Sequence, residues 1–399
     1  MKKIIMILVS ILLMSTFSTL PFFFSEAQAY PEIKQLTRND FDDYLGSGGY
    51  SHDHALSWDG SKVVFWTKHS EYDFKVYVMN TTDDPGQEKM MTTAYGRNNF
   101  ASISADGSKI VFGSNRKNPT DPWYSCEIFV MNTADEPGDE VQITDDAFVD
   151  HDPDISGNGE IIAWHSSPYE PTGWDIIVAN ISDMNNINKW SLVTGPDDVF
   201  YPSLTYDGKS MSFWNRDKND VFFINTNGTG LRNLTNSPEY EFPADAISGD
   251  GKTVAFQRMV GGDYEIFVYN IATATSTQLT ENDSDDLLGG LNGDGTVVTY
   301  SRDGHIFMHN MVSETQLTDG SFDDRWPRIS GDGNTIVFVS NRDNPDYDIF
   351  MLQLKGPVGG VWVPINRFEL LAPWIGLASL ITIATVSVFY IKYRKKKQN

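Results

Sequence analysis

Short apolar runs alternate with polar turns along residues 30–355, and no helical period occurs in this range. The runs are continuous rather than alternating, as is typical of strands covered on both faces. Seven runs follow a tetrapeptide of the form Ser/Thr/Asn-x-Asp/Asn-Gly. Asp, Asn and Gly tolerate positive φ, so each tetrapeptide predicts a tight hairpin turn. The turn glycines are Gly60, Gly107, Gly159, Gly208, Gly251, Gly295 and Gly333.

Each turn belongs to a repeat of four short strands. The turn glycines are 38 to 52 residues apart. After the hairpin comes a third run, such as Ile128–Asn132 or Ile266–Asn270, and then a fourth that ends on Leu-Thr or Ile-Thr. Four strands per repeat are typical of one propeller blade, and seven repeats predict an all-β, seven-bladed β-propeller. A β-sandwich is the alternative, and the regular repetition disfavours it.

The last repeat lacks its fourth strand. It stops near Lys355, and Gly356-Pro357 follows where a Leu-Thr strand would stand. The missing strand is found at the other end of the chain, in the segment Ile33–Thr37. We therefore expect this segment to be the outer strand of the seventh blade, which would close the ring and remove exposed sheet edges.

The repeat pattern S-x-D-G-K-x-I-V-F-x-S-N-R, D-I-F-V-M-N, Q-L-T resembles the TolB-like (WD40-like, PD40) class of β-propeller. It is clearest at Ile103–Arg116 and Ile329–Arg342, and the resemblance covers about residues 30–355. The resemblance implies a propeller fold. It implies one of three roles: a protein-binding module, a gating domain beside a peptidase, or a sugar-cleaving enzyme.

The two ends of the chain predict export and membrane anchoring. Residues 1–29 combine Lys2 and Lys3, an apolar stretch and Ala27-Gln28-Ala29, a pattern typical of a signal peptide. An uncleaved membrane helix is the alternative. Residues 356–369 are a predicted linker, and 370–391 carry no charge over 22 residues. A helix of that length spans roughly 33 Å, enough to cross a bilayer. The basic residues 392–399 should stay in the cytoplasm, with the propeller outside.

The anchor also carries a resemblance of its own. The segment VGGVWVPINRFELLAPWIGLASLI, closing on RKKKQN, resembles the C-terminal anchors of surface proteins in some archaea. The resemblance covers about a tenth of the chain and implies an archaeal cell-surface protein.

Charge and cysteine content exclude several classes of function. The formal net charge is −24; residues 1–29 carry +1 and 361–399 carry +5, which leaves −30 on residues 30–360. Such a surface repels phosphate backbones, which argues against nucleic-acid binding. The single cysteine, Cys126, excludes an internal disulfide and is expected to be buried and inert. No G-x-S-x-G elbow or P-loop is present, so nucleophilic and nucleotide chemistry lack support.

The connections between repeats are acidic, and one of them is a candidate metal site. Hairpin turns lie on one face of a propeller, so we interpret Asp59 and its equivalents as structural. Function is expected on the opposite face, where the loops vary. There Asp150, Asp152 and Asp154 are the best cluster for Ca²⁺, which prefers carboxylate oxygens as ligands. Solvated acidic loops that bind no metal are the alternative.

Histidines beside acids form the second candidate. His52-Asp53-His54 and His151-Asp152 are expected at corresponding positions, at the start of the inner strands of two blades. Imidazoles near the central channel would suit a transition metal or a general base. The TolB-like resemblance points the same way, since some lyases of this class that act on oligogalacturonides place histidines and a metal at the channel mouth. Hydrogen bonding between blades is the simpler interpretation.

Aromatic residues and glycosylation triplets complete the candidates. Trp123, Tyr124, Tyr169 and Trp174 lie in two of the longer loops, where they would stack on sugars, contact a partner, or pack on each other. Five Asn-x-Ser/Thr triplets predict N-glycans at some of their positions. They begin at Asn80, Asn180, Asn227, Asn233 and Asn282.

Together these features favour a non-enzymatic surface receptor or scaffold that binds a protein or a glycan. The alternative is a metal-dependent, lyase-like enzyme acting on oligosaccharides, with its site at the channel mouth.

Overall fold

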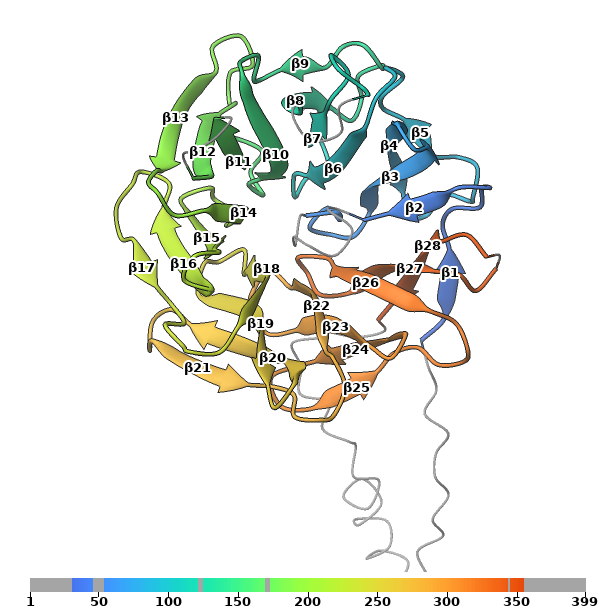
Figure 1. Cartoon of the computed structure of the whole chain (residues 1–399). Helices are drawn as coiled ribbons and strands as arrows, with labels where there is room; N and C mark the ends of the chain where they lie inside the picture. Colours follow the sequence, from blue (N-terminus) through green and yellow to red (C-terminus); the bar gives the residue numbers. More distant parts are fainter. Residues whose placement is uncertain (1–30, 46–53, 121–124, 169–172, 344, 355–399) are drawn as a thin grey trace, which may run out of the picture. The chain divides into compact units, whose positions relative to one another are not determined.

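The computed structural model describes residues 31–45, 54–120, 125–168, 173–343 and 345–354. Within these residues the chain forms seven antiparallel sheets of four strands, arranged as blades around a central axis (Figure 1). The predicted all-β seven-bladed propeller is therefore confirmed.

In six of the blades the four strands follow one another in the chain from the axis outward, and in the seventh the outer strand comes from the start of the chain (Figure 1). The first three blades are β2 (Asp42–Tyr44), β3 (Lys62–Ser70), β4 (Asp73–Asn80) and β5 (Lys89–Met90); β6 (Asn98–Ile103), β7 (Lys109–Ser114), β8 (Glu127–Asn132) and β9 (Val141–Gln142); and β10 (Phe148–Ile155), β11 (Ile161–Pro168), β12 (Asp175–Asn180) and β13 (Asn188–Val193).

The remaining four blades continue the same order. They are β14 (Val199–Leu204), β15 (Ser210–Asn215), β16 (Asp220–Asn225) and β17 (Arg232–Asn233); β18 (Glu241–Ile247), β19 (Thr253–Val260), β20 (Asp263–Asn270) and β21 (Thr275–Gln278); β22 (Leu287–Leu291), β23 (Val298–Arg302), β24 (His305–His309) and β25 (Glu314–Gln316); and β26 (Asp324–Ile329), β27 (Thr335–Ser340) and β28 (Asp348–Gln353), with β1 (Ile33–Gln35) as the outer strand.

The two ends of the propeller meet in the seventh blade. Strand β1 pairs antiparallel with β28, with Ile33 opposite Leu352 and Gln35 opposite Phe350. The N–H of Leu36 then donates to the carbonyl of Ile349 at 2.8 Å, and the Leu36 side chain is fully buried. The predicted closure by the N-terminal segment is confirmed, and it covers the edge of β28 that would otherwise be unpaired.

Apolar side chains fill the spaces between neighbouring blades. Each blade presents buried residues on both faces of its second and third strands, which explains why these strands are continuous apolar runs. Stacked rings join the two strands within several blades, as in Phe112 and Phe129, whose centroids are 5.7 Å apart. One cluster includes both Leu36 and Phe65, so the closing segment is part of the core between the seventh and first blades.

The hairpin turns form a closed ring on one face, here called the hairpin face. All seven turn glycines have φ between 66° and 75°, as the tetrapeptides predicted. Asp59 accepts hydrogen bonds from Ser57 Oγ and the Ser61 N–H, so its structural role is confirmed. Seven backbone hydrogen bonds of 2.7–3.1 Å link each turn to the next: Trp58 to Ala105, Ala105 to Gly157, Asn158 to Tyr206, Tyr206 to Gly249, Asp250 to Gly293, Gly293 to Gly331, and Asp332 to Trp58.

The residue before each turn Asp or Asn lies at the hairpin-face end of the channel. Four of these seven residues are glycines, and the indole of Trp58 packs against three of them, Gly249, Gly293 and Gly331. The ring of Tyr206 lies edge-on to Trp58, with centroids 5.2 Å apart. Trp58 therefore narrows this end of the channel, and the glycines make room for its ring.

Several predictions concern segments that the structure does not describe. The signal peptide at 1–29, the linker at 356–369, the membrane helix at 370–391 and the basic tail at 392–399 all lie outside the described residues. Within the described residues, no helix has the length and apolar character needed to cross a bilayer.

Candidate functional site

The predicted site residues divide into those that the structure describes and those that it does not. His52, Asp53, Trp123, Tyr124 and Tyr169 lie outside the described residues. The others are described. They are His54, Asp150, His151, Asp152, Asp154 and Trp174.

The register corrects the expected equivalence of the two histidine pairs. His151 on β10 pairs with His165, and Tyr44 on β2 pairs with Trp66. His165 and Trp66 each follow their turn glycine by six residues, so the counterpart of His151 in the first blade is Tyr44. The prediction failed because the inner strand of that blade is interrupted: residues 46–53 separate β2 from the bridge between Leu56 and Val63.

Strained bulges interrupt the inner strands at equivalent positions. The register shifts seven residues before the turn glycine, and four non-glycine residues there adopt left-handed backbone conformations. A left-handed φ costs a non-glycine residue about 1–2 kcal/mol, and bulges often redirect a side chain at a binding site. The four residues, with φ of 48–55°, are Phe100, Asp152, Tyr201 and Trp326.

Half-buried rings gather around a buried histidine beside these bulges. The ring of His165 is 5.0 Å from Trp174, 5.0 Å from Phe200 and 5.6 Å from Tyr201, measured between centroids. Asp152 Oδ2 lies 3.5 Å from His165 Nε2. Burial, with the neighbouring His151, holds the pKa of His165 well below its usual range, so this ring is neutral. Trp174 therefore packs against other rings and keeps part of its surface exposed.

A histidine that borders the central cavity is hydrogen-bonded to a buried carboxylate. His54 Nδ1 lies 3.0 Å from Asp154 Oδ1, which also accepts from Ser102 Oγ at 2.8 Å. The second oxygen of Asp154 accepts from the Leu204 N–H at 2.8 Å. His54 and Arg328 both border a cavity of about 60 Å³ that reaches Trp58. That volume holds about two water molecules and no sugar ring.

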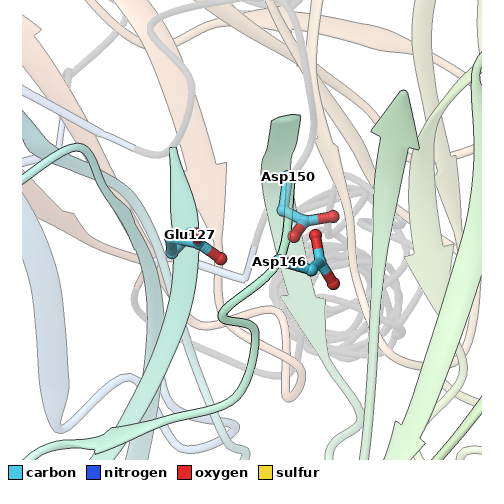
Figure 2. Close-up of side chains that lie close together, drawn as sticks. All are labelled: Glu127, Asp146 and Asp150. Atoms are coloured by element: carbon cyan, nitrogen blue, oxygen red, sulfur yellow. The ribbon is translucent and has the colours of Figure 1, made fainter. Parts of the chain in front are cut away.

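A second group of acids converges where the second and third blades meet. Glu127 begins β8, Asp150 lies on β10, and Asp146 lies in the connection just before β10 (Figure 2). One carboxylate oxygen of each lies within 4.8 Å of one from each of the others. Among the described residues this is the one group of three or more Asp, Glu, His or Cys that meets this limit. We call it the carboxylate cluster.

The carboxylate cluster differs from the predicted set Asp150, Asp152 and Asp154. Asp150 belongs to it, but Asp152 faces His165 and Asp154 faces His54. Residues at alternate positions of a regular strand share one face, but the register shift between His151 and Asp154 breaks the alternation, so the three acids do not converge. Glu127 was missed by the sequence argument, because it lies in another blade.

Burial governs the protonation of the carboxylate cluster. Glu127 is 4% exposed and Asp150 is 1% exposed. Burial raises the pKa of Glu127 to about 7 and that of Asp150 to about 6, and the negative charge of Asp146 adds to both effects. Cys126, directly before Glu127, is buried with a raised thiol pKa, as expected for an inert cysteine.

The five glycosylation triplets have different surroundings. Asn80 and Asn227 are exposed. The amide nitrogens of Asn233 and Asn282 donate to the carboxylates of Asp220 and Asp286 at 2.6 and 2.8 Å. Asn180 is half-buried and accepts from the Ser182 N–H. Asn80 Nδ2 likewise donates to Asp83 at 2.9 Å, so a glycan on Asn80, Asn233 or Asn282 would break a hydrogen bond. The amide of the exposed Asn227 uses only its oxygen, as an acceptor, in the bonds to Thr229, so this asparagine is the most accessible of the five.

Known structures support the fold. An oligogalacturonate lyase from Vibrio parahaemolyticus superposes with a TM-score of 0.63 at 14% identity, over 82% of this chain and 94% of that one. An oligogalacturonate lyase in complex with manganese gives 0.63 at 16% identity, over 84% and 96%. TolB from Acinetobacter baumannii gives 0.43 at 16% identity, over 75% and 82%. No protein-family model and no curated protein sequence matches the chain. At these identities the likeness to the two lyases shows the propeller fold alone.

Proposed function

We propose that the protein is a non-enzymatic binding module on the outer side of the cell membrane, anchored by residues 370–391. Its ligand is a neutral saccharide, and the site is the set of bulge residues with the rings beside them. The observation that carries the proposal is the left-handed backbone at Phe100, Asp152, Tyr201 and Trp326. Such conformations persist where the surrounding structure imposes them, and they cluster at binding and active sites, so four of them at equivalent positions support a site here.

The chemistry of these side chains supports a sugar ligand. Phe100, Tyr201 and Trp326 are half-buried, so each keeps part of its ring surface accessible. Aromatic faces stack on the apolar faces of sugars, while Asp152 and His151 supply polar groups for hydroxyls. The rings are held by their neighbours, which lowers the entropic cost of binding.

Charge argues for a neutral sugar rather than an acidic one. The chain carries a formal net charge of −24, which repels a polyuronide. The two solved neighbours are named for an oligogalacturonate, which is an anionic saccharide. If this protein shares their affinity for sugars, its charge shifts the preference away from uronic acids.

A lyase-like enzyme is the second candidate, and one contact favours it. His54 is hydrogen-bonded to the buried Asp154 and borders the same cavity as Arg328, so a base and a cation face one space. An acidic partner would orient the imidazole for proton abstraction. The small volume of that cavity counts against a saccharide substrate there.

A glycan array with the purified full-length protein tests the binding proposal. We expect neutral saccharides to bind, and Tyr201→Asn to reduce the affinity at least tenfold, since Asn tolerates the left-handed φ but has no ring. Tyr95→Ala, which removes a 55% exposed ring outside the group, is the matched control. Binding that Tyr201→Asn leaves unchanged would contradict the proposal. Release of an unsaturated product from oligogalacturonate, lost in His54→Ala, would favour the enzyme.

A further inference from the structure

Pairs of acids recur where one blade meets the next. The first acid lies near the start of a third strand, and the second lies near the start of the inner strand of the following blade. At three of these interfaces the N–H of the second acid donates to the carbonyl just before the first: Asp150 to Cys126, Asp43 to Tyr347, and Asp286 to Tyr264. Four pairs of this kind are described: Asp348 with Asp43, Glu127 with Asp150, Asp220 with Glu241, and Glu265 with Asp286.

Neutral donors hold the Glu265–Asp286 pair together. Asn282 Nδ2 donates to Asp286 at 2.8 Å, and the Asn282 N–H donates to Glu265 at 2.7 Å. The hydroxyl of Thr280 donates to Glu265 at 2.6 Å, and Arg302 neutralises Asp286 with bonds of 2.5 and 2.9 Å. Donors and one guanidinium therefore satisfy both carboxylates.

The position of Asn282, two residues after the Thr of the Leu-Thr pair, supplies donors at two other interfaces. In the Asp220–Glu241 pair it is Ser237, which donates to both acids, and Arg258 binds Glu241. In the Asp348–Asp43 pair it is Asn39, whose Nδ2 donates to Asp43 at 3.0 Å.

The Glu127–Asp150 pair breaks this rule. Two residues after Thr144 the chain has Asp146, an acid in place of a donor. In two other pairs an arginine binds the second acid: Arg258 binds Glu241, and Arg302 binds Asp286. The residue paired with Asp150 is Ser166 instead. As a result Glu127 Oε2 and Asp150 Oδ2 are buried and make no hydrogen bond. Lys117 is close, but it pairs with the exposed Asp145.

We propose that the carboxylate cluster binds a divalent cation, Ca²⁺, in place of the donors found at the other interfaces. Three carboxylates offer up to six hard oxygen ligands, and no imidazole or thiolate belongs to the group, which suits Ca²⁺ better than Zn²⁺. Trp164 Nε1 donates to Asp150 Oδ1 at 2.8 Å, so this carboxylate is fixed with its other oxygen available. Asp146 is exposed, so water would reach the ion on this side and complete its coordination.

The ion would tie three segments together. Glu127 comes from β8, Asp146 from the connection between blades, and Asp150 from β10 (Figure 2). Binding would thus stabilise the junction of the second and third blades and would neutralise three like charges. The proposal is independent of the saccharide proposal, because a cation can bind whether or not a sugar does.

Terbium luminescence on the full-length protein, stripped with EDTA, tests the proposal. Tb³⁺ substitutes for Ca²⁺, and Trp164 is hydrogen-bonded to a proposed ligand, so excitation of tryptophan should sensitise the ion. We expect saturable luminescence that Ca²⁺ displaces and Trp164→Phe strongly reduces. Ca²⁺ should also raise the melting temperature.

Asp146→Asn is the decisive variant, because it installs the donor found at position 39 or 282. We expect it to reduce Ca²⁺ affinity at least tenfold while the EDTA-treated variant melts at or above the wild-type temperature. Asp145→Asn, an exposed neighbour outside the cluster, should leave affinity unchanged. Absence of saturable binding at millimolar Ca²⁺ would overturn the proposal. So would an equal loss in Asp145→Asn and Asp146→Asn, which would indicate diffuse binding to an acidic surface.

Discussion

The indole of Trp58 lies against the backbone of Gly293 so closely that a Cβ on this glycine would sit 2.1 Å from ring atom Cη2. We therefore expect Gly293→Ala to displace the ring and lower the stability by about 1–3 kcal/mol, as overpacking does elsewhere. Thermal unfolding followed by circular dichroism measures the effect. Gly195→Ala is the control, since nothing lies within 4 Å of its added methyl group. Equal melting temperatures for the two variants would show that Trp58 moves freely.

Closure of the ring by the N-terminal strand predicts a large effect of one apolar residue. Leu36 is fully buried beside β28, although it lies only a few residues from the predicted mature N-terminus. Leu36→Ala should cost about 2–5 kcal/mol, as for other core leucines. The exposed Glu32 provides the control, and Glu32→Ala should unfold like the wild type in a urea titration. A Leu36→Ala protein of unchanged stability would mean that the strand contributes little to closure.

The stability of the propeller should fall as pH rises toward neutrality. Burial raises the pKa of Asp43 to about 7, with a further rise from the charge of Asp348. The folded protein therefore keeps this proton in a pH range where the unfolded chain has lost it, so the stability that it contributes disappears between about pH 4 and pH 7. Asp43→Asn should flatten this dependence, as measured by melting temperatures from pH 5 to pH 8 in EDTA.

Some pH dependence should remain in Asp43→Asn, because Glu127 and Asp150 have raised pKa values as well. A steeper decline in the variant than in the wild type would contradict the assignment to Asp43.

Asp154 joins several blades through one carboxylate. It accepts from His54, from Ser102 and from the Leu204 N–H, which lie in three different blades. Asp154→Asn replaces one acceptor oxygen by a donor, so at least one buried group loses its partner, at a cost of about 1–3 kcal/mol. Chemical denaturation should show this loss, and Ser102→Ala, which removes one contact, should cost less. Equal effects would mean that the other two bonds carry little energy.

Much of the fold followed from short-range chemistry. The turn tetrapeptides predicted the hairpins because an Asp-Gly or Asn-Gly pair fixes a positive φ locally, as at Gly60 and Gly333. The closing strand was predictable because the seventh repeat lacked a piece that the N-terminus supplied. Both inferences needed only the repeat and its count.

The candidate site depends on contacts and backbone conformations that are not visible in the repeat pattern of the sequence. The bulges at Phe100 and Tyr201 carry no turn signal, because their conformation is imposed by the sheet. Glu127 and Asp146 lie in different repeats, and only the packing of two blades brings them together. One signal was present in the sequence: aligning the Leu-Thr pairs shows Asp146 where Asn39 and Asn282 stand.

The seven backbone bonds that join the hairpin turns have a consequence for chain connectivity. Each bond runs from the N–H of one turn to the carbonyl of the next, and the last returns from Asp332 to Trp58, so no blade is terminal in this hoop. The hoop does not depend on where the polypeptide starts. A circular permutant, cut in an exposed inter-blade loop and joined through its former ends, should therefore keep all seven links, which a linear repeat array with fraying caps cannot do.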